Sequence, residues 1–260
     1  MGILNITPDS FYDGGRYASY EQAMLQAEKL VKQGADIIDV GGESTRPGSE
    51  VVPASVQIER TLPVIREIKK KCPGTIVSID ATSAQVARAA LDAGASIIND
   101  VSGFQFDPDM SKIAGEYKCG CVVNHIKGTP KNMQNDPTYD DLWGEIKSYL
   151  KKSVELLTDA GVARESIVVD PGIGFGKKLE HNLKILRELK TLENMGFPIL
   201  IGPSRKAFIG ALLDLPTEKR LEGTIAAAVV GLINGAKILR VHDVEEIKRA
   251  IAVAWAIYND

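Results

Sequence analysis

Three segments of this 260-residue chain repeat one short pattern, and this repeat is the strongest constraint on the fold. Residues 34–39, 94–99 and 235–240 each read Gly-Ala, one polar residue, two aliphatic residues and a residue with a hydrogen-bonding side chain. Glycine ends a helix at low cost, and the aliphatic pair suits a short strand buried on both faces. The copies start 60 and 141 residues apart, which suits two and four βα units of about 30 to 35 residues. Eight such units make a barrel of about 250 residues, so we predict an α/β fold, a (β/α)8 TIM barrel, with residues 1–260 in a single domain.

The rest of the chain alternates between strand and helix patterns without a low-complexity linker. We predict strands at residues 2–6, 36–40, 75–79, 120–123, 166–169 and 198–201, and two further strands that end at residues 99 and 240. Helical patterns cover about 19–32, 54–71, 83–92, 142–157, 207–213 and 222–232, and Asp107-Pro108 is expected to open another helix. Ser83 suits the cap of the helix that follows it. The segments 7–15 and 41–49 are rich in Gly, Pro and polar residues, which predicts two long loops.

Composition excludes several classes of function. The chain is 44% hydrophobic and 25% charged, with no apolar run of membrane-spanning length, so a membrane role is not expected. Its net charge of -3 provides no electrostatic footprint for nucleic acid. The three cysteines, Cys72, Cys119 and Cys121, lack metal-binding spacing, which favours reduced thiols and a cytoplasmic location.

Every predicted strand ends in a residue that can form hydrogen bonds. Barrel enzymes place their chemistry at the carboxyl ends of the strands. One such aspartate is weak evidence, because an Asp after a strand is more often a helix cap. A whole ring of polar side chains at one barrel mouth is better explained by a bound ligand than by capping. The chain offers two carboxylates, an amide and an ammonium at these positions: Asp80, Asp170, Asn99 and Lys206.

This set of side chains suits a flat heterocycle with several hydrogen-bonding edges. A carboxylate accepts two parallel N–H bonds from an aminopyrimidinone edge, and a bond to a charged partner contributes about 1.5 to 3 kcal/mol. Arg240 can lie on the ring face. Next to these residues, the chain carries a second set that suits a phosphate group and Mg²⁺, which prefers few protein ligands: Asn5, Thr45, Arg46, Ser204 and His242.

Six motifs in this order resemble the dihydropteroate synthase family, a group of pterin-binding barrels. They are MGILNITPDSF at 1–11, GADIIDVGGESTRPG at 34–48, INDVSG at 98–103, DPGIGFGK at 170–177, SRK at 204–206 and RVHD at 240–243. The resemblance covers essentially the whole chain. It implies condensation of 6-hydroxymethyl-7,8-dihydropterin diphosphate with 4-aminobenzoate, giving 7,8-dihydropteroate and pyrophosphate.

The resemblance also implies roles for individual residues. The expected catalytic residues are Asp80, Lys206, Arg240 and His242. The pterin is expected to contact Asp80, Asn99, Val101, Asp170, Phe175, Gly202, Lys206 and Arg240. The diphosphate and the aminobenzoate are expected to contact Asn5, Phe11, Thr45, Arg46, Pro47, Ser204 and His242, with Asn5 as a ligand of Mg²⁺, the expected cofactor.

The family is thought to follow an S_N1-like path, in which pyrophosphate leaves first with help from Mg²⁺, arginine and a charged histidine. The expected partners are the two small substrates and a second copy of the chain, because family members commonly form homodimers through late helices. Three positions depart from the family pattern: Asn124 replaces the usual Met, Ala81 replaces Thr and Tyr12 replaces Ser. Two alternatives remain at this point, a methyltetrahydrofolate:corrinoid methyltransferase on the same fold and a non-catalytic pterin-binding protein.

Overall fold

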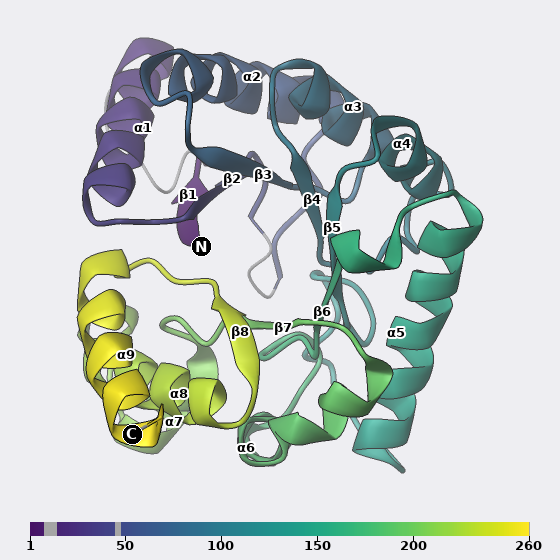
Figure 1. The fold of residues 1–260 in the computed structure, drawn as a ribbon, viewed down its shortest axis with the longest axis vertical. Coiled ribbons are helices and arrows are strands. Elements are labelled where there is room, and N and C mark those ends of the chain that lie inside the picture. The colour runs from purple at the N-terminus through teal and green to yellow at the C-terminus, as the bar shows by residue number, and fades with distance from the viewer. Residues whose placement is uncertain (8–14, 45–47, 260) are drawn as a thin grey trace.

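A parallel sheet forms the centre of the molecule in the computed structural model, which describes residues 1–7, 15–44 and 48–259 (Figure 1). In this part of the chain, eight strands pair in sequence order. They are β1 (Gly2–Asn5), β2 (Ile37–Gly41), β3 (Ile76–Asp80), β4 (Ile97–Asp100), β5 (Gly120–Asn124), β6 (Ile167–Asp170), β7 (Ile199–Ile201) and β8 (Ala236–Leu239). The sheet curls so that Gly2 pairs with Val241, and the backbone N–H of Ile3 donates to the Val241 oxygen at 2.9 Å. The fold is therefore TIM-barrel-like, as the repeats predict.

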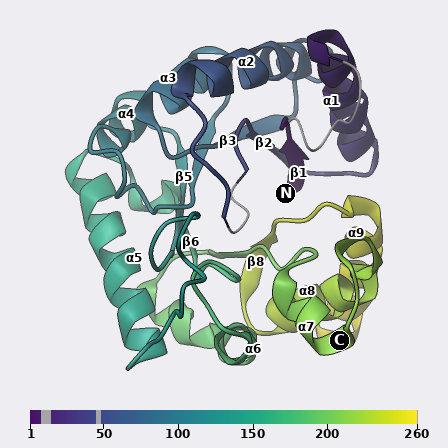
Figure 2. The ribbon, with the colours of Figure 1, turned by 180° about the vertical axis from the view of Figure 1, so that it is seen from behind.

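Helices surround the sheet on its outer side, as the two opposite views show (Figures 1 and 2). The α-helices are α1 (Gly15–Lys32), α2 (Ala54–Lys71), α3 (Ala84–Asp92), α4 (Met110–Tyr117), α5 (Leu142–Asp159), α6 (Leu179–Arg187), α7 (Ala207–Leu213), α8 (Leu221–Ile233) and α9 (Val244–Asn259). Short 3₁₀ turns lie at Arg164–Ser166, Leu189–Met195 and Thr217–Lys219. No helix in the described ranges is both long and apolar enough to cross a membrane.

One helix boundary differs from the prediction for a physical reason. Asp107 does not open α4, which begins at Met110. Instead, its Oδ2 accepts the backbone N–H of Ala84 at 2.8 Å, at the start of α3. Ser83 occupies the N-cap position of α3, but its side chain makes no capping bond. The cap that we predicted from Ser83 is thus supplied by an aspartate from the neighbouring βα unit.

The inside of the curled sheet has an apolar layer near the amino ends of the strands. Met1, Val122 and Leu200 form its centre, and the partly buried residues that pack against them are Ile37, Ile97, Val168 and Ile238. Side chains alternate between the two faces of a strand, so the next inward positions toward the carboxyl ends are two residues further on. These positions include Asp39 and Asn99, and polar groups therefore lie directly above the apolar layer.

The repeated glycines end helices or turns as expected. Gly34, Gly94 and Gly235 all have positive φ, at 84°, 107° and 102°. Each allows the chain to turn from a helix into a strand that brings a polar side chain into the interior. The repeat therefore determines where polar side chains enter the interior, as well as where the strands begin.

Candidate active site

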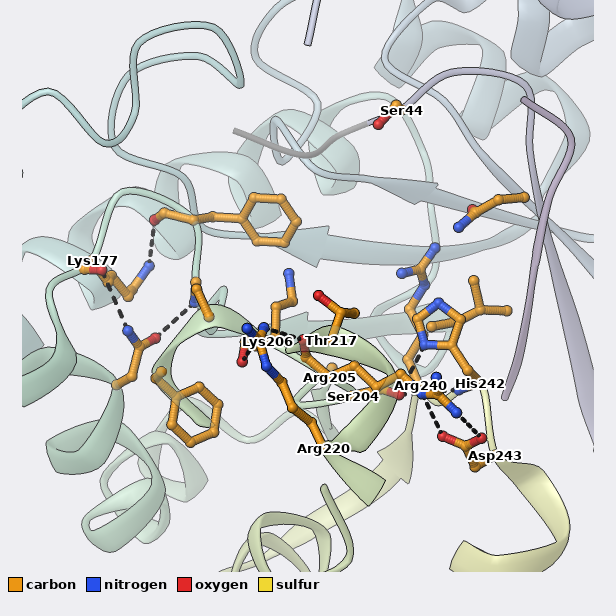
Figure 3. A pocket seen from close by; sticks show the side chains of 18 of the residues that line it. Ser44, Lys177, Ser204, Arg205, Lys206, Thr217, Arg220, Arg240, His242 and Asp243 are labelled. Atoms are coloured by element: carbon orange, nitrogen blue, oxygen red, sulfur yellow. Dashed lines mark hydrogen bonds and ion pairs between the residues drawn. The ribbon is translucent and has the colours of Figure 1, made fainter. Parts of the chain in front are cut away.

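A cavity of about 1070 Å³ lies at the carboxyl ends of the strands. Its lining includes seven of the predicted site residues: Asn5, Phe175, Gly202, Ser204, Lys206, Arg240 and His242. Figure 3 shows the basic side chains Lys206, Arg240 and His242 within this cavity. The structure thus brings together residues from β1 and from the segments after β6, β7 and β8.

Arg240 connects the cavity to buried carboxylates below it. Its Nη2 donates to Asp80 Oδ2 at 2.6 Å, and its Nε donates to Asp39 Oδ2 at 2.6 Å. The same Asp39 oxygen accepts the Asn99 side-chain N–H at 2.9 Å. Burial raises the pKa of Asp80, Arg240 opposes the increase and Asp39 adds to it. Asp80, Asn99 and Arg240, predicted separately, are therefore one hydrogen-bonded group, and Asp39 joins it.

Asp170 ends β6 and lies beside Asn124 in the strand register. Its Oδ1 accepts the backbone N–H of Gly172 at 2.7 Å. Within the described ranges, no group donates to its other oxygen, Oδ2. Burial raises the pKa of Asp170 to about 6, although the Gly172 N–H and the positive charge of Lys206 oppose the increase. One carboxylate oxygen is thus fixed and the other is available to a ligand.

Lys206 lies over the ring of Phe175, with Nζ 3.9 Å from the ring centroid. Burial lowers the pKa of Lys206 to about 8, and the charge of Arg240 adds to the decrease. Phe175 also packs with the cluster that contains Val101, so both predicted apolar contacts belong to one wall. Lys206 is therefore a cation between an aromatic ring and the carboxylates.

Ser204 and His242 form a pair on the phosphate side of the cavity. Ser204 Oγ lies 2.9 Å from His242 Nδ1 and accepts the His242 backbone N–H at 3.2 Å. The Ser204 hydroxyl can therefore donate to Nδ1, which assigns the imidazole proton to Nε2. Burial lowers the pKa of His242 to about 4. In the protein without a bound anion, His242 is therefore a neutral N–H donor near pH 7.

Several predicted contacts lie outside the described residues. These are Phe11, Thr45, Arg46 and Pro47, together with Tyr12. Ser44, which immediately precedes them, lines the cavity.

The donor set suits Mg²⁺ only as an ion shared with a substrate. The described ranges hold no group of three or more His, Cys, Asp or Glu side chains placed to bind a metal. The amide of Asn5 lines the cavity and offers one oxygen of the kind that Mg²⁺ accepts. Because Mg²⁺ completes its shell with phosphate oxygens and water, one protein ligand fits a diphosphate-bound ion.

Sequence reasoning missed three residues at this site. Asp39 ends one copy of the repeat, but the repeat did not show how deep in the sheet the Asp39 carboxylate lies.

The other two residues are Lys177 and His125. Lys177 Nζ lies 2.9 Å from His125 Nδ1 and donates to the Phe175 oxygen at 3.0 Å. Burial lowers the pKa of both Lys177 and His125. Figure 3 shows Lys177 away from Lys206 and Arg240, where it holds the loop that carries Phe175.

Asn124, which departs from the family pattern, is buried, and its side-chain NH₂ group has hydrogen-bond partners. Its Nδ2 donates to the Val101 oxygen at 3.0 Å and to the His125 oxygen at 3.3 Å. Its amide therefore joins the end of β5 to the loop after β4. Ala81, the second departure, is a buried part of the main core.

Comparison with known proteins identifies the family of the chain. The family described as "Pterin binding enzyme" matches residues 1–242. A dihydropteroate synthase of Synechocystis sp. is 47% identical over 260 residues, which cover 100% of this chain and 90% of the relative. The crystal structure of a dihydropteroate synthase from Clostridium difficile in the presence of pteroic acid has a TM-score of 0.94 and 44% identity, with coverage of 100% and 96%. A Xanthomonas albilineans dihydropteroate synthase with 4-aminobenzoic acid has a TM-score of 0.93 and 36% identity, with coverage of 100% and 93%. The chain therefore belongs to the pterin-binding enzyme family and, within it, to the dihydropteroate synthases.

Proposed function

We propose that this chain condenses 6-hydroxymethyl-7,8-dihydropterin diphosphate with 4-aminobenzoate, giving 7,8-dihydropteroate and pyrophosphate. The observation that carries the proposal is the continuous arrangement of groups at the cavity. Buried carboxylates and an amide lie below Arg240, and neutral and cationic N–H donors lie beside it. The relatives crystallised with pteroic acid and 4-aminobenzoic acid support the same substrates.

The pterin is the ligand of the deeper groups. Asp170 Oδ2 accepts from the ring N3–H and the 2-amino group, since Gly172 already occupies Oδ1. Asn99 and Asp80 bind the opposite ring edge, and Lys206 donates to the carbonyl oxygen and N5. Val101, Phe175 and Gly202 contact the ring itself, and Arg240 lies against its face.

The diphosphate is the ligand of Asn5, Ser204, Arg240 and His242. The neutral His242 donates from Nε2, and the guanidinium supplies positive charge where negative charge develops on the leaving oxygens. When bound at Asn5, Mg²⁺ would neutralise further charge on these oxygens.

The reaction then follows an S_N1-like path. The bond between the pterin methylene carbon and the diphosphate oxygen breaks, and its electron pair leaves with pyrophosphate. The positive charge on the methylene is delocalised into the ring, near the carboxylates of Asp80 and Asp170. The aminobenzoate nitrogen attacks this carbon and then loses a proton to solvent or pyrophosphate. Phe11, Thr45, Arg46 and Pro47 are proposed to contact aminobenzoate or diphosphate.

The wider organisation is part of the same proposal. We infer that the curled sheet is a closed (β/α)8 barrel, that residues 1–260 act as one domain and that the enzyme works in the cytoplasm.

A homodimer is supported by large apolar side chains exposed on the late helices: Leu212, Leu213, Val230, Val253, Trp255, Ile257 and Tyr258. Sedimentation of the purified chain at twice its 28.1 kDa mass tests the dimer.

The decisive experiment is a product assay. The protein is mixed with the pterin diphosphate, Mg²⁺ and 4-aminobenzoate, and 7,8-dihydropteroate is measured by mass. A parallel reaction with methyltetrahydrofolate and cobalamin tests the methyltransferase alternative. Dihydropteroate without methylcobalamin supports the proposal, and the absence of dihydropteroate overturns it. In single turnover, pyrophosphate release that always requires aminobenzoate would contradict the S_N1-like order.

A further inference from the structure

Asp39 is a buried carboxylate that the proposed reaction does not use directly. It lies on β2 and does not line the cavity, and neither do Asp80, Asn99 and Asp170. Those three side chains are 7% to 10% exposed, however, whereas Asp39 is fully buried. Its Oδ2 nevertheless accepts from two proposed pterin-binding residues, Arg240 at 2.6 Å and Asn99 at 2.9 Å. One oxygen atom thus connects a residue after β8 with a residue on β4.

Stability alone does not explain an aspartate at this position. Its other oxygen, Oδ1, has no hydrogen-bond partner within the described ranges, and neither has the hydroxyl of Ser78, its register partner on β3. Burial of a carboxylate with an unsatisfied oxygen is costly, and apolar residues can often replace buried ion pairs without loss of stability. Two residues earlier on β2, Ile37 already packs against the apolar layer. The carboxylate therefore has a role other than filling the interior.

The first effect of Asp39 is on the guanidinium of Arg240. Asp39 takes the Nε hydrogen and Asp80 takes one Nη2 hydrogen, so two neighbouring strands hold the group at two points. The Nη1 hydrogens make no hydrogen bond to any residue in the described ranges. A side chain held in this way loses little further freedom when it binds a ligand.

The second effect of Asp39 is on the amide of Asn99. Asn99 Nδ2 donates one of its two hydrogens to the carboxylate. A flipped amide would set oxygen against oxygen, so the carboxylate fixes the orientation. Asn99 therefore presents its Oδ1 acceptor and its second N–H donor in fixed positions, which suits the edge of a heterocycle.

We propose that Asp39 is a positioning residue of the pterin site, which holds the guanidinium of Arg240 in place and fixes the orientation of the Asn99 amide. This inference rests on the proposed function, since it concerns the same ligand. It adds a residue that never touches the pterin but determines how two others meet it.

The charge of Asp39 also acts on Asp80. The charged groups that face Asp80 are Arg240, which lowers its pKa, three carboxylates that raise it, Asp39, Asp100 and Glu43, and the ammonium of Lys206. Removal of the Asp39 charge should therefore lower the pKa of Asp80. This shift reports the charge of Asp39, whereas the affinity for the pterin reports its positioning of Arg240 and Asn99.

Two substitutions separate the charge from the hydrogen bonds. Asp39→Asn can keep an oxygen between Arg240 and Asn99, so it removes mainly the charge. Asp39→Ala removes the acceptor as well. Ser78→Ala is the matched control, because it deletes a buried polar group on the adjacent strand that has no partner within the described ranges.

The readouts are the affinity for pteroic acid by calorimetry and the titration of Asp80 by carbon NMR of ¹³C-labelled aspartates, assigned with Asp80→Asn. We expect Asp39→Ala to weaken binding about 10- to 100-fold, as loss of a charged hydrogen bond predicts. Asp39→Asn should weaken binding less and move the Asp80 midpoint to lower pH. Ser78→Ala should change affinity by less than about twofold and leave the midpoint in place.

Two results would overturn the inference: binding by Asp39→Ala within twofold of wild type, or an Asp80 midpoint that Asp39→Asn leaves unchanged. If Asp39→Ala does not fold, the isosteric Asp39→Asn decides through its affinity for pteroic acid: binding within twofold of wild type would overturn the inference. Failure of the wild-type protein to bind pteroic acid would instead refute the proposed function, and the Asp80 titration would still test the coupling to Asp39.

Discussion

The substitution Asp170→Asn tests the pterin site most directly, because the structure predicts which way the new amide faces. In the wild-type protein, Asp170 Oδ1 accepts the Gly172 N–H at 2.7 Å. An asparagine can keep this bond only with its oxygen, so its NH₂ group must take the place of Oδ2. A donor then faces the donors of the pterin. Asp170→Ala removes the acceptor but introduces no opposing donor.

The magnitude follows from the number of bonds lost. One hydrogen bond to a charged oxygen contributes about 1.5 to 3 kcal/mol, so the loss of two such bonds in Asp170→Ala should weaken pteroic acid binding about 150- to 25,000-fold. Asp170→Asn should bind pteroic acid more weakly still, because its NH₂ group sets a donor against the N–H donors of the pterin. Calorimetry at pH 7.5 measures both affinities, and circular dichroism checks that both variants are folded. Equal affinity of the two variants, or tighter binding by Asp170→Asn, would refute the reasoning.

Four further predictions follow from the same contacts. Affinity for pteroic acid should be highest between about pH 6 and pH 8. It should fall at lower pH because Asp170 takes up a proton, and at higher pH because Lys206 loses one. A flat affinity profile from pH 5 to 9 would contradict both assignments. Gly172→Ala should lower the free energy of unfolding by more than about 2 kcal/mol, because a Cβ there would lie 1.8 Å from the His125 oxygen; Gly161→Ala, also at positive φ but with open space around it, is the control in chemical denaturation. Asn124→Met should cost about 1 to 3 kcal/mol of stability in the same assay, since it removes the side-chain donor to the buried Val101 oxygen and leaves the His125 oxygen with the longer, 3.5 Å bond from Lys177 Nζ; unchanged stability would count against that role. Chelation of Mg²⁺ with EDTA should abolish dihydropteroate formation and added Mg²⁺ should restore it; full activity in EDTA would exclude the metal.

Much of the fold was predictable because its signals are local. A glycine that ends a helix and an aliphatic pair that forms a strand lie within six residues, and the repeat of this unit sets the length of each βα step. Capping was less predictable. Asp107 caps α3 from 23 residues away, so no pattern near Ser83 could reveal it.

The site was predictable as a set of residues but less so as a network. Polar residues at strand ends identify Asp80, Asn99 and Arg240, whereas their mutual contacts depend on the stagger between strands. Asp39 illustrates the difference: the repeat identifies it as a strand-end residue, and only the pairing of β2 with its neighbours brings it below Arg240. The charge state of His242 was also unpredictable, because its pKa depends on burial.

The apolar layer around Met1, Val122 and Leu200 has a consequence for the timing of turnover. Because this layer fills the interior at the amino ends of the strands, molecules enter and leave by the opposite opening alone. In the arrangement that we propose, the pterin is the deepest occupant. We therefore expect the pterin to enter before aminobenzoate, and pyrophosphate to depart before the joined product.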